Sequence, residues 1–464
     1  MTQPNPTASS PAPLMLGISG MRGLVGQSLK PELVCRYAAA FGHWLKSARN
    51  TQTPTVVLGR DSRPSGAMYE DAVAAGLASV GCKVIRVGII STPGVAIMGD
   101  HHKADGGMVI TASHNPKPWN GVKLLRHDGV APPPDEAKTI IQLFNDNAAL
   151  HANVDDLHPG TSDNTGAQIH LDRVTAIVDI EAIRAAKLKV VVDSVHGAGG
   201  DEAALLLDHL GVERVHLYAQ PTGHFPHVPE PTRENLTELC AAVKQHGADV
   251  GFAQDPDADR LALVDENGTY IGEEYTLVLC AMAQLQSGDT TVANLSTSRM
   301  IDDVAAAVGA TVIRTPVGEA NVAAGMREHN ATVGGEGNGG IIYRPITQVR
   351  DSVVGMAMVC ELLAKRGKPL SKHVAATPAY AMIKDKIEIV PGSSEPTLAW
   401  TAQHFKDQKV DTQDGVRVDW PDRWVHVRPS NTEPILRIIA EAAHEADARA
   451  LVDTVRQGIA SLNA

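Results

Sequence analysis

A serine beside a histidine is the segment of this chain with the most evident chemical potential. Residues 107–110 are an apolar run, and Ser113, His114, Asn115 and Pro116 follow shortly after it. Sheets of α/β proteins bind ligands at the carboxyl ends of their strands, and an Asn-Pro pair favours a turn that exposes its neighbours. A hydroxyl next to an imidazole suits nucleophilic or phosphoryl-carrier chemistry. Ser113 is therefore a candidate nucleophile or phosphoryl carrier, although a Ser-His pair on a loop is, by itself, about as often without function.

Three aspartates at alternate positions form the second candidate site. Asp255, Asp257 and Asp259 can converge on one hard cation if their loop curls, and an all-oxygen set of three favours Mg²⁺. The alternative is a solvated acidic loop, which carries the cost of like charges held close together. An EF-hand is disfavoured because residues 261–264 read as a strand and not as a ligand-bearing loop.

A polar loop near the C-terminus offers a cradle for a phosphate group. It contains Arg428, Ser430, Asn431 and Thr432, between two apolar runs that read as strands. Arginine binds phosphate in a bidentate fashion, and turn backbones form anion-binding nests. A plain polar turn is the alternative.

Three further features of the sequence give weaker evidence of a functional site when each is considered alone. The glycine-rich residues 334–340 include Glu336 and Asn338, whose side chains suit bidentate hydrogen bonds to sugar hydroxyls, and a merely flexible loop is the alternative. Arg22 lies in another glycine-rich turn. Lys123 is the kind of residue usually found on a surface, but if it were buried near arginines it could lose its proton and act as a base.

The elements that would position these residues follow one repeated pattern. A β-branched run, an amphipathic helix, a glycine and a second β-branched run recur in residues 55–87, 189–217 and 290–314. The helices are expected at roughly 66–80, 200–210 and 298–308. Strands that alternate with helices indicate βαβ units and mostly parallel sheets. A glycine at each helix end predicts a left-handed cap. The final 85 or so residues instead predict two strands around a polar loop and a closing helix, which is typical of a smaller α+β domain.

We therefore predict the α/β class, with three similar domains and a C-terminal α+β domain. The expected boundaries are a disordered tail at 1–13, domain I at 14–166, domain II at 167–267, domain III at 268–376 and domain IV at 377–464.

The composition of the chain limits the classes of partner that it is expected to bind. The chain has 464 residues and a net charge of −12, which argues against nucleic acid and anionic membranes as partners. No apolar run approaches the ~18 residues that span a bilayer. The five cysteines have neither metal-ligand nor redox spacing, so we expect reduced thiols and a cytoplasmic location.

Together and in this order, the motifs resemble those of the α-D-phosphohexomutase superfamily, which includes phosphoglucosamine, phosphomanno- and phosphoglucomutases. The resemblance covers essentially the whole chain after the tail. It implies three similar α/β domains and a fourth α+β domain around a central cleft, as the repeats also predict. It further implies a small sugar phosphate as the partner, and we expect a monomer or homodimer.

The resemblance also implies roles for individual residues. The residues expected around the transferred phosphoryl group are Ser113 as the phosphoserine, His114 in an acid/base or orienting role, Lys123 as the general base, and Arg22 and Arg260 as cations. The expected Mg²⁺ ligands are Asp255, Asp257, Asp259 and an oxygen of phosphorylated Ser113. The expected substrate-binding residues are Glu336 and Asn338 for the sugar, and Arg428, Ser430, Asn431 and Thr432 for the phosphate that is not being transferred. The implied cycle passes through a hexose 1,6-bisphosphate, which also serves as activator.

Two departures from the family pattern bear on the substrate. Many relatives carry Ser and His where this chain has Asn338 and Gly340, and Thr where it has Ile18. The glycine-rich variant resembles archaeal-type phosphoglucosamine mutases, so glucosamine phosphate is the first expected substrate, with mannose or glucose phosphate as the alternative. A Mg²⁺-dependent sugar phosphatase and a non-catalytic sugar-phosphate-binding protein are further alternatives. The phosphate cradle argues against the phosphatase, because a hydrolase need not hold a second phosphate. The presence of Ser113 together with the aspartates argues against a non-catalytic binding protein, because binding alone would not require them.

Overall fold

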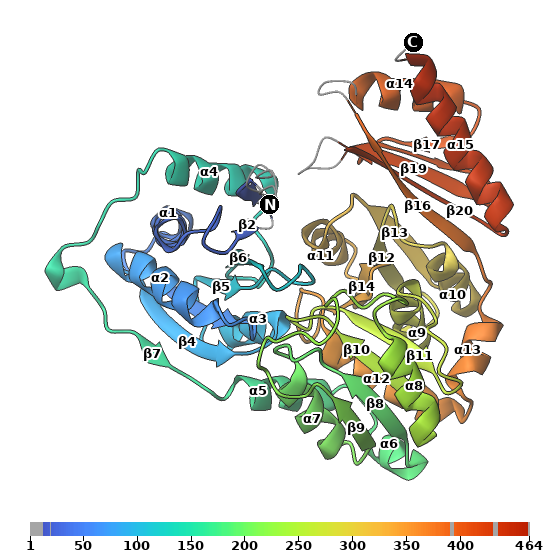
Figure 1. Cartoon of the computed structure of the whole chain (residues 1–464), viewed down its shortest axis with the longest axis horizontal. Coiled ribbons are helices and arrows are strands. Elements are labelled where there is room, and N and C mark those ends of the chain that lie inside the picture. The colour runs from blue at the N-terminus through green and yellow to red at the C-terminus, as the bar shows by residue number, and fades with distance from the viewer. Residues whose placement is uncertain (1–12, 19, 390–393, 430–434, 463–464) are drawn as a thin grey trace, which may run out of the picture.

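Four β-sheets flanked by helices make up the computed structural model, which describes residues 13–18, 20–389, 394–429 and 435–462 (Figure 1). The predicted tail falls almost wholly outside these ranges. The first sheet and the C-terminal sheet lie far apart, and the second and third sheets lie close together (Figure 1). Within the described ranges, no helix combines the length and apolar character needed to cross a membrane.

The first sheet has seven strands in the order β1-β2-β6-β5-β3-β4-β7. Its strands are β1 Met15–Gly17, β2 Gly20–Leu24, β3 Thr55–Arg60, β4 Lys83–Ile89, β5 Gly106–Ile110, β6 Trp119–Arg126 and β7 Thr161–Ser162. The helices of this region are α1 Pro31–Ala48, α2 Gly66–Ser79, α3 Thr92–His101 and α4 Pro134–Asn145, and the 3₁₀ helix η1 Val154–Asp156 lies just before β7.

The second and third sheets have four strands each. The second has the order β11-β10-β8-β9, from β8 Lys189–Asp193, β9 Glu213–Leu217, β10 Val250–Gln254 and β11 Leu261–Asp265. Its helices are α5 Gly166–Thr175, α6 Ile180–Ala186, α7 Gly200–His209 and α8 Thr237–His246.

The third sheet has the order β13-β12-β14-β15, from β12 Thr290–Asn294, β13 Thr311–Thr315, β14 Val333–Glu336 and β15 Gly340–Tyr343. Its helices are α9 Glu274–Gln284, α10 Met300–Val308, α11 Glu319–Glu328, α12 Ser352–Arg366 and α13 Leu370–Ala376.

One four-strand pattern recurs in these three sheets. In β6-β5-β3-β4 the successive pairings are antiparallel, parallel and parallel. The same succession holds for β11-β10-β8-β9 and for β15-β14-β12-β13. The prediction of three similar, mostly parallel α/β units is therefore confirmed. The glycines predicted to end their central helices adopt the left-handed conformation, with φ of 81° at Gly81, 68° at Gly211 and 75° at Gly309.

The last sheet is entirely antiparallel, in the order β16-β20-β19-β18-β17. Its strands are β16 Ala381–Glu388, β17 Lys409–Asp411, β18 Val416–Asp419, β19 Trp424–Pro429 and β20 Ile435–Ala442, and its helices are α14 Ser394–His404 and α15 Glu445–Leu462. This confirms the α+β prediction for the C-terminal part.

The second and third units share a core. Helix α12 is apolar on all sides and nearly all of its side chains are buried, which is typical of a helix enclosed by other elements. It packs against α6 of the second unit and α9 of the third, and a single hydrophobic cluster continues across both units. The two sheets therefore form a fixed base for the loops between them.

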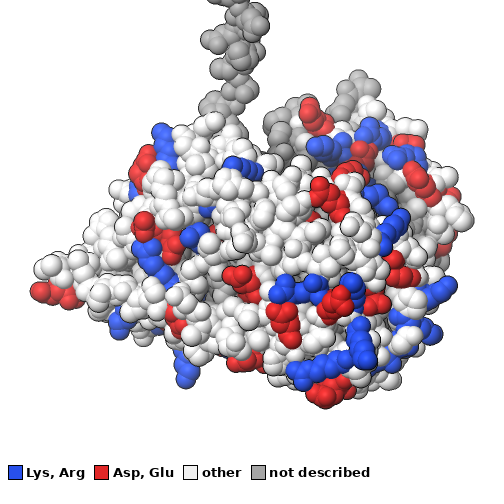
Figure 2. Space-filling view, turned by 60° about the horizontal axis from the view of Figure 1, so that its bottom comes forward, with Lys and Arg blue, Asp and Glu red and all other residues white. Residues whose placement is uncertain are grey.

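The surface carries both signs of charge. On the face drawn in Figure 2, Lys and Arg side chains are interspersed with Asp and Glu. All five cysteines are unpaired, and Cys82, Cys280 and Cys360 are buried.

Candidate active site

Ser113 lies on a sharp turn at the carboxyl end of β5. Its backbone has a φ of 50°, in the left-handed region that non-glycine residues seldom adopt, and its side chain is only 2% exposed. Such strain persists where the surroundings enforce it, often at functional sites. The amide of Ser113 donates to Thr111 Oγ1 at 2.8 Å, and the Thr111 hydroxyl donates to Asp61 at 2.7 Å.

Arg63 holds this turn from behind, and the sequence analysis did not identify it. Its fully buried guanidinium donates to the carbonyls of Ser113 at 2.7 Å and Asn115 at 2.6 Å. It also donates to the carbonyls of Pro116 and Trp119, and its Nε pairs with Asp61 at 3.0 Å. The available signal was its position just after β3, because β3 and β5 are parallel neighbours and their carboxyl ends meet at one edge of the sheet.

The three aspartates meet at the carboxyl end of β10, next to Ser113. All three are fully buried, and the Ser113 hydroxyl donates to Asp255 Oδ2 at 2.9 Å. Asp257 Oδ2 accepts from Lys123 at 2.6 Å and from Thr92 at 2.6 Å. Among the described residues, no group donates to Oδ1 of Asp257 or Oδ1 of Asp259.

These unsatisfied oxygens fit a cation. The carboxylates each offer an oxygen within 4.8 Å of the others. Burial, and then the charges of Asp259 and Asp257, raise the pKa of Asp255 well above its ordinary value. Burial acts in the same direction on Asp259, but Arg350 and Lys123 outweigh it and hold its pKa well below the ordinary value. Buried oxygen-only carboxylates with two unpartnered oxygens match the preference of Mg²⁺.

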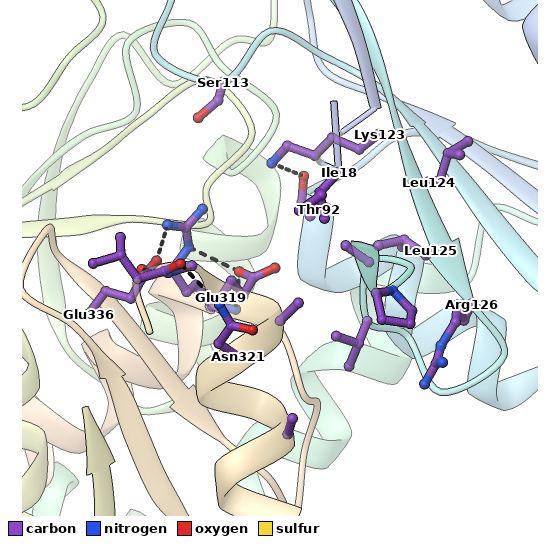
Figure 3. A pocket seen from close by; sticks show the side chains of 18 of the residues that line it. Ile18, Thr92, Ser113, Lys123, Leu124, Leu125, Arg126, Glu319, Asn321 and Glu336 are labelled. Carbon is purple, nitrogen blue, oxygen red and sulfur yellow. Dashed lines mark hydrogen bonds and ion pairs between the residues drawn. The ribbon is translucent and has the colours of Figure 1, made fainter. Parts of the chain in front are cut away.

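A cavity of about 470 Å³ opens in front of Ser113 and the aspartate loop. Figure 3 shows Lys123, Leu124, Leu125 and Arg126 on one side and Glu319, Asn321 and Glu336 on the other. The cationic side chains that line it are Arg22, Lys123, Arg126, Arg260, Arg327 and Arg350, against the carboxylates Glu319 and Glu336. The local balance is thus positive in a chain of net charge −12, so the cavity suits an anionic ligand.

Arg22 and Arg260 both reach this cavity, as expected. Arg22 donates to Asn115 Oδ1 at 3.2 Å, on the Ser113 turn. The Nε of Arg260 is buried and has no hydrogen-bond acceptor among the described residues, while the amide of Arg260 donates to Asp255 at 3.1 Å. An anion in the cavity would satisfy that guanidinium.

Lys123 and His114 differ in charge. Burial alone would lower the pKa of Lys123, but Asp257 and Asp259 outweigh it and raise the pKa above the ordinary value, so Lys123 is a cation here. Burial, Arg260 and Arg22 lower the pKa of His114 to about 3, so its imidazole is neutral. His114 Nδ1 lies 3.4 Å from Ser113 Oγ.

The glycine-rich loop joins β14 to β15 and places one carboxylate at the cavity wall. Glu336 accepts from Asn294 at 2.8 Å and from the Gly318 amide at 3.1 Å, so its position is well determined. Asn338 Oδ1 is buried and has no donor among the described residues. The Glu336 carboxylate and the Asn338 amide oxygen are hydrogen-bond acceptors, so both suit a ligand that presents hydroxyl groups.

Arg428 does not line this cavity. It lies one residue before the end of β19 and pairs through Nε with Asp414 at 3.0 Å. Ser430, Asn431 and Thr432, predicted to continue the phosphate cradle, lie outside the described residues.

Behind the site, a buried charge network joins the first three units. His170 contacts Glu202 at 2.8 Å and Asp351 at 2.8 Å, and Glu202 also accepts from the hydroxyl and the amide of Ser91. Burial alone would lower the pKa of His170, but Asp351 and Glu202 outweigh it and raise the pKa to about 10. Asp351 also caps α12 by accepting from the Val353 amide. The network thus fixes α3, α5, α7 and α12 relative to one another.

This network makes stability depend on pH. The pKa of His170 is raised above its unfolded value of 6.5, so its contribution is complete below pH 6.5 and is lost as the pH rises toward 10. Breaking such a buried pair costs about 3–5 kcal/mol. We expect the His170→Gln variant to be destabilised by about that much at pH 6 and by progressively less up to pH 10, as measured by urea unfolding.

The exposed His246 on α8 provides a matched control. His246→Gln should unfold like the unaltered protein at each pH. A loss of stability in His170→Gln that stays constant from pH 6 to pH 10 would contradict the assignment of a charged His170.

In this α/β protein, a buried serine, a candidate metal site and a cavity lined by cations thus lie together, an arrangement that suits phosphoryl transfer. Models of the four domains of phosphoglucomutase/phosphomannomutase match residues 14–151, 168–268 and 272–380 for the three alpha/beta/alpha domains and 393–458 for the C-terminal domain. The chain therefore belongs to the phosphoglucomutase/phosphomannomutase family of phosphohexomutases, which are isomerases.

Individual relatives agree with this placement. A phosphoglucomutase/phosphomannomutase of Thermococcus kodakarensis is 40% identical over 440 residues, covering 94% of this chain and 96% of the relative. A probable phosphoglucosamine mutase of Methanopyrus kandleri is 37% identical over 451 residues, covering 95% and 97%. The crystal structure of a phosphoglucomutase/phosphomannomutase family protein from Burkholderia thailandensis superposes with a TM-score of 0.82 at 27% identity, covering 96% of this chain and 98% of that one.

Proposed function

We propose that this enzyme interconverts a hexose 6-phosphate and the corresponding hexose 1-phosphate, with phosphorylated Ser113 as carrier and glucosamine phosphate as the preferred substrate. The observation that carries the proposal is the contact of 2.9 Å between Ser113 Oγ and Asp255, beside a cavity lined by cations. A hydroxyl that is to accept and return phosphate needs a cation and positive side chains around it.

Mg²⁺ fits the aspartate loop. Asp257 and Asp259 would bind it through the oxygens that lack donors, Asp255 would supply a third oxygen, and a phosphate oxygen on Ser113 would complete the protein's ligand set. When bound, the ion would neutralise charge on the phosphoryl group during transfer.

The reaction consists of two transfers. In the first, the bond between Ser113 Oγ and phosphorus breaks and a free hydroxyl of the sugar phosphate bonds to that phosphorus, which gives a hexose 1,6-bisphosphate. The bisphosphate reorients in the cavity. In the second, the other phosphoryl group returns to Ser113 Oγ. Arg22 and Arg260 would bind the phosphoryl group during its transfer. Electrostatic stabilisation of this group accounts for most of the catalysis of phosphoryl transfer.

Each transfer also moves a proton. The attacking hydroxyl loses one and the leaving oxygen gains one. Lys123 and His114 are the residues placed for this, because Lys123 lines the cavity and His114 Nδ1 lies 3.4 Å from Ser113 Oγ. We propose Lys123 as the general base and His114 in an acid/base or orienting role. Lys123 could accept a proton only once Mg²⁺ compensates the charge of Asp257 and Asp259, because these carboxylates otherwise outweigh the effect of burial, raise its pKa and keep it protonated.

The sugar and its second phosphate would be bound by separate loops. Glu336 and Asn338 offer carboxylate and amide oxygens to the sugar hydroxyls. Arg428, with the loop after it, would hold the phosphate that is not being transferred, which requires the last sheet to approach the cavity. A free hexose 1,6-bisphosphate would phosphorylate Ser113 and so activate the enzyme.

A comparison of substrates tests the proposal. The enzyme is assayed with glucosamine 6-phosphate, mannose 6-phosphate and glucose 6-phosphate, each with its 1,6-bisphosphate and Mg²⁺, and kcat/KM is compared. We expect the 1-phosphate as product in each case and the highest kcat/KM for glucosamine 6-phosphate, by about tenfold, because discrimination by one hydrogen-bonding group amounts to about 1–3 kcal/mol.

Two results would contradict parts of this assignment. A higher kcat/KM for mannose 6-phosphate or glucose 6-phosphate would show that the enzyme prefers that sugar phosphate to glucosamine 6-phosphate. Inorganic phosphate released as fast as the sugar phosphate is consumed would overturn the mutase reaction in favour of a phosphatase.

A further inference from the structure

Arg350 lies at the meeting point of two functional loops. It lies between β15 and α12, lines the cavity and is 12% exposed. Its guanidinium donates to Asp259 of the metal loop at 2.7 Å and to Glu336 of the sugar loop at 2.8 Å. Its Nε lies 3.0 Å from Glu319, at the start of α11. One side chain thus links the metal loop, the sugar loop and the start of α11, which lies on the same side of the cavity as the sugar loop (Figure 3).

Gly340 is shaped to accommodate this side chain. A Cβ atom built on Gly340 would lie 2.1 Å from Cδ and 2.8 Å from Cγ of Arg350, closer than real atoms approach. The stem of Arg350 therefore fills the space that any larger residue at position 340 would need.

The contacts of Arg350 also show what it is not suited to do. Three carboxylates surround one guanidinium, so its charge is already compensated. Arg260 has a single, more distant carboxylate neighbour, Asp259 at 3.9 Å, so it is the better placed cation for a phosphate. Arg350 is thus placed to orient its neighbours, and its planar fork can contact two carboxylates at once in a fixed geometry.

From this geometry we infer that Arg350, with Gly340 as its necessary partner, is a positioning residue that holds Glu336 toward the sugar at a fixed distance from the metal loop. The inference rests on the proposed function, since it assumes that Glu336 binds the sugar. It assigns Arg350 no contact with the transferred phosphoryl group.

A double-mutant cycle tests the pairing of Arg350 with Gly340. We expect Gly340→Ala alone to lower kcat/KM by about 10- to 100-fold, because the methyl group displaces Arg350 and a misplaced group in a site costs about that much. In the Arg350→Ala background the same change should cost less than about threefold, since its main steric conflict is gone. An equal cost of Gly340→Ala in both backgrounds would overturn the pairing.

A second set of variants separates positioning from folding. Arg350→Ala should raise KM for the sugar phosphate more than it lowers kcat, and added guanidinium at non-denaturing concentration should recover at least about tenfold in kcat/KM, whereas ammonium should not. Arg350→Lys should recover little, because an ammonium group lacks the planar fork. A fall in kcat with KM unchanged, or kcat/KM within about threefold of the unaltered enzyme, would overturn the positioning role.

Failure of this inference can be told apart from failure of the proposed function. The unaltered enzyme tests the mutase reaction, whereas the cycle compares variants with one another. Normal mutase turnover without coupling between positions 340 and 350 would overturn this inference alone.

Discussion

Replacing Ser113 with alanine should abolish mutase turnover while leaving the fold intact. We expect kcat to fall by at least ~10⁴-fold, because removal of a covalent nucleophile eliminates the two-step route itself. Among the described residues, the Ser113 hydroxyl has hydrogen-bond partners only in Asp255 and His114, and loss of one such hydrogen bond costs about 1–2 kcal/mol. Initial rates with glucosamine 6-phosphate and its bisphosphate, together with a thermal melt, measure both effects.

Ser62 provides the matched control for this experiment. Its buried hydroxyl donates to the carbonyl of His196 at 2.7 Å, and it does not line the cavity. Ser62→Ala should lose a similar amount of stability but keep kcat within a few-fold of the unaltered enzyme. Near-normal turnover in Ser113→Ala would remove the carrier role from Ser113.

The second large effect is expected from the metal loop. Asp257→Asn should lower kcat by about 10²–10³-fold, since a bound cation stabilises transferring charge by several kcal/mol. The amide replaces a charged ligand that also pairs with Lys123 and Thr92. The midpoint of a Mg²⁺ titration of activity, begun after chelator treatment, should rise by at least about tenfold.

A control for the metal experiment comes from another cluster of potential ligands. His101, His102 and Asp163 also lie within reach of one ion, at the end of α3 and after β7. Asp163→Asn should leave the Mg²⁺ titration of activity unchanged. If Asp257→Asn left the titration unchanged as well, the aspartate loop would not be the metal site.

Local signals in the sequence account for much of the fold. The predicted helix at 66–80 is α2 Gly66–Ser79, and that at 200–210 is α7 Gly200–His209. The helix predicted from Ser298 begins at Met300, because the Ser298 hydroxyl accepts from the Met300 amide and so lies just before the helix. Apolar periodicity and glycine caps are properties of neighbouring residues, and such properties can be recognised in one chain.

The residues that sequence reasoning missed act over long distances. Arg63 contacts a loop about 50 residues away, Arg350 contacts Asp259 across 91 residues, and His170 contacts Asp351 across 181. A single arginine or histidine has no local pattern that marks such a contact. The expected gathering of Ser113 with the aspartates was implied by the family resemblance. In the structure the two motifs follow strands of different sheets, β5 and β10, so local strand signals alone could not have placed them together.

The central claim is that Ser113 transfers its phosphoryl group directly to the sugar. The most direct measurement is a single turnover in which enzyme labelled with ³²P on Ser113 is mixed with glucosamine 6-phosphate and Mg²⁺ and quenched at millisecond intervals. The account predicts that label leaves Ser113, appears first in the 1,6-bisphosphate and then in the sugar monophosphate. Label that stays on the protein during turnover, or that appears only as inorganic phosphate, would contradict it.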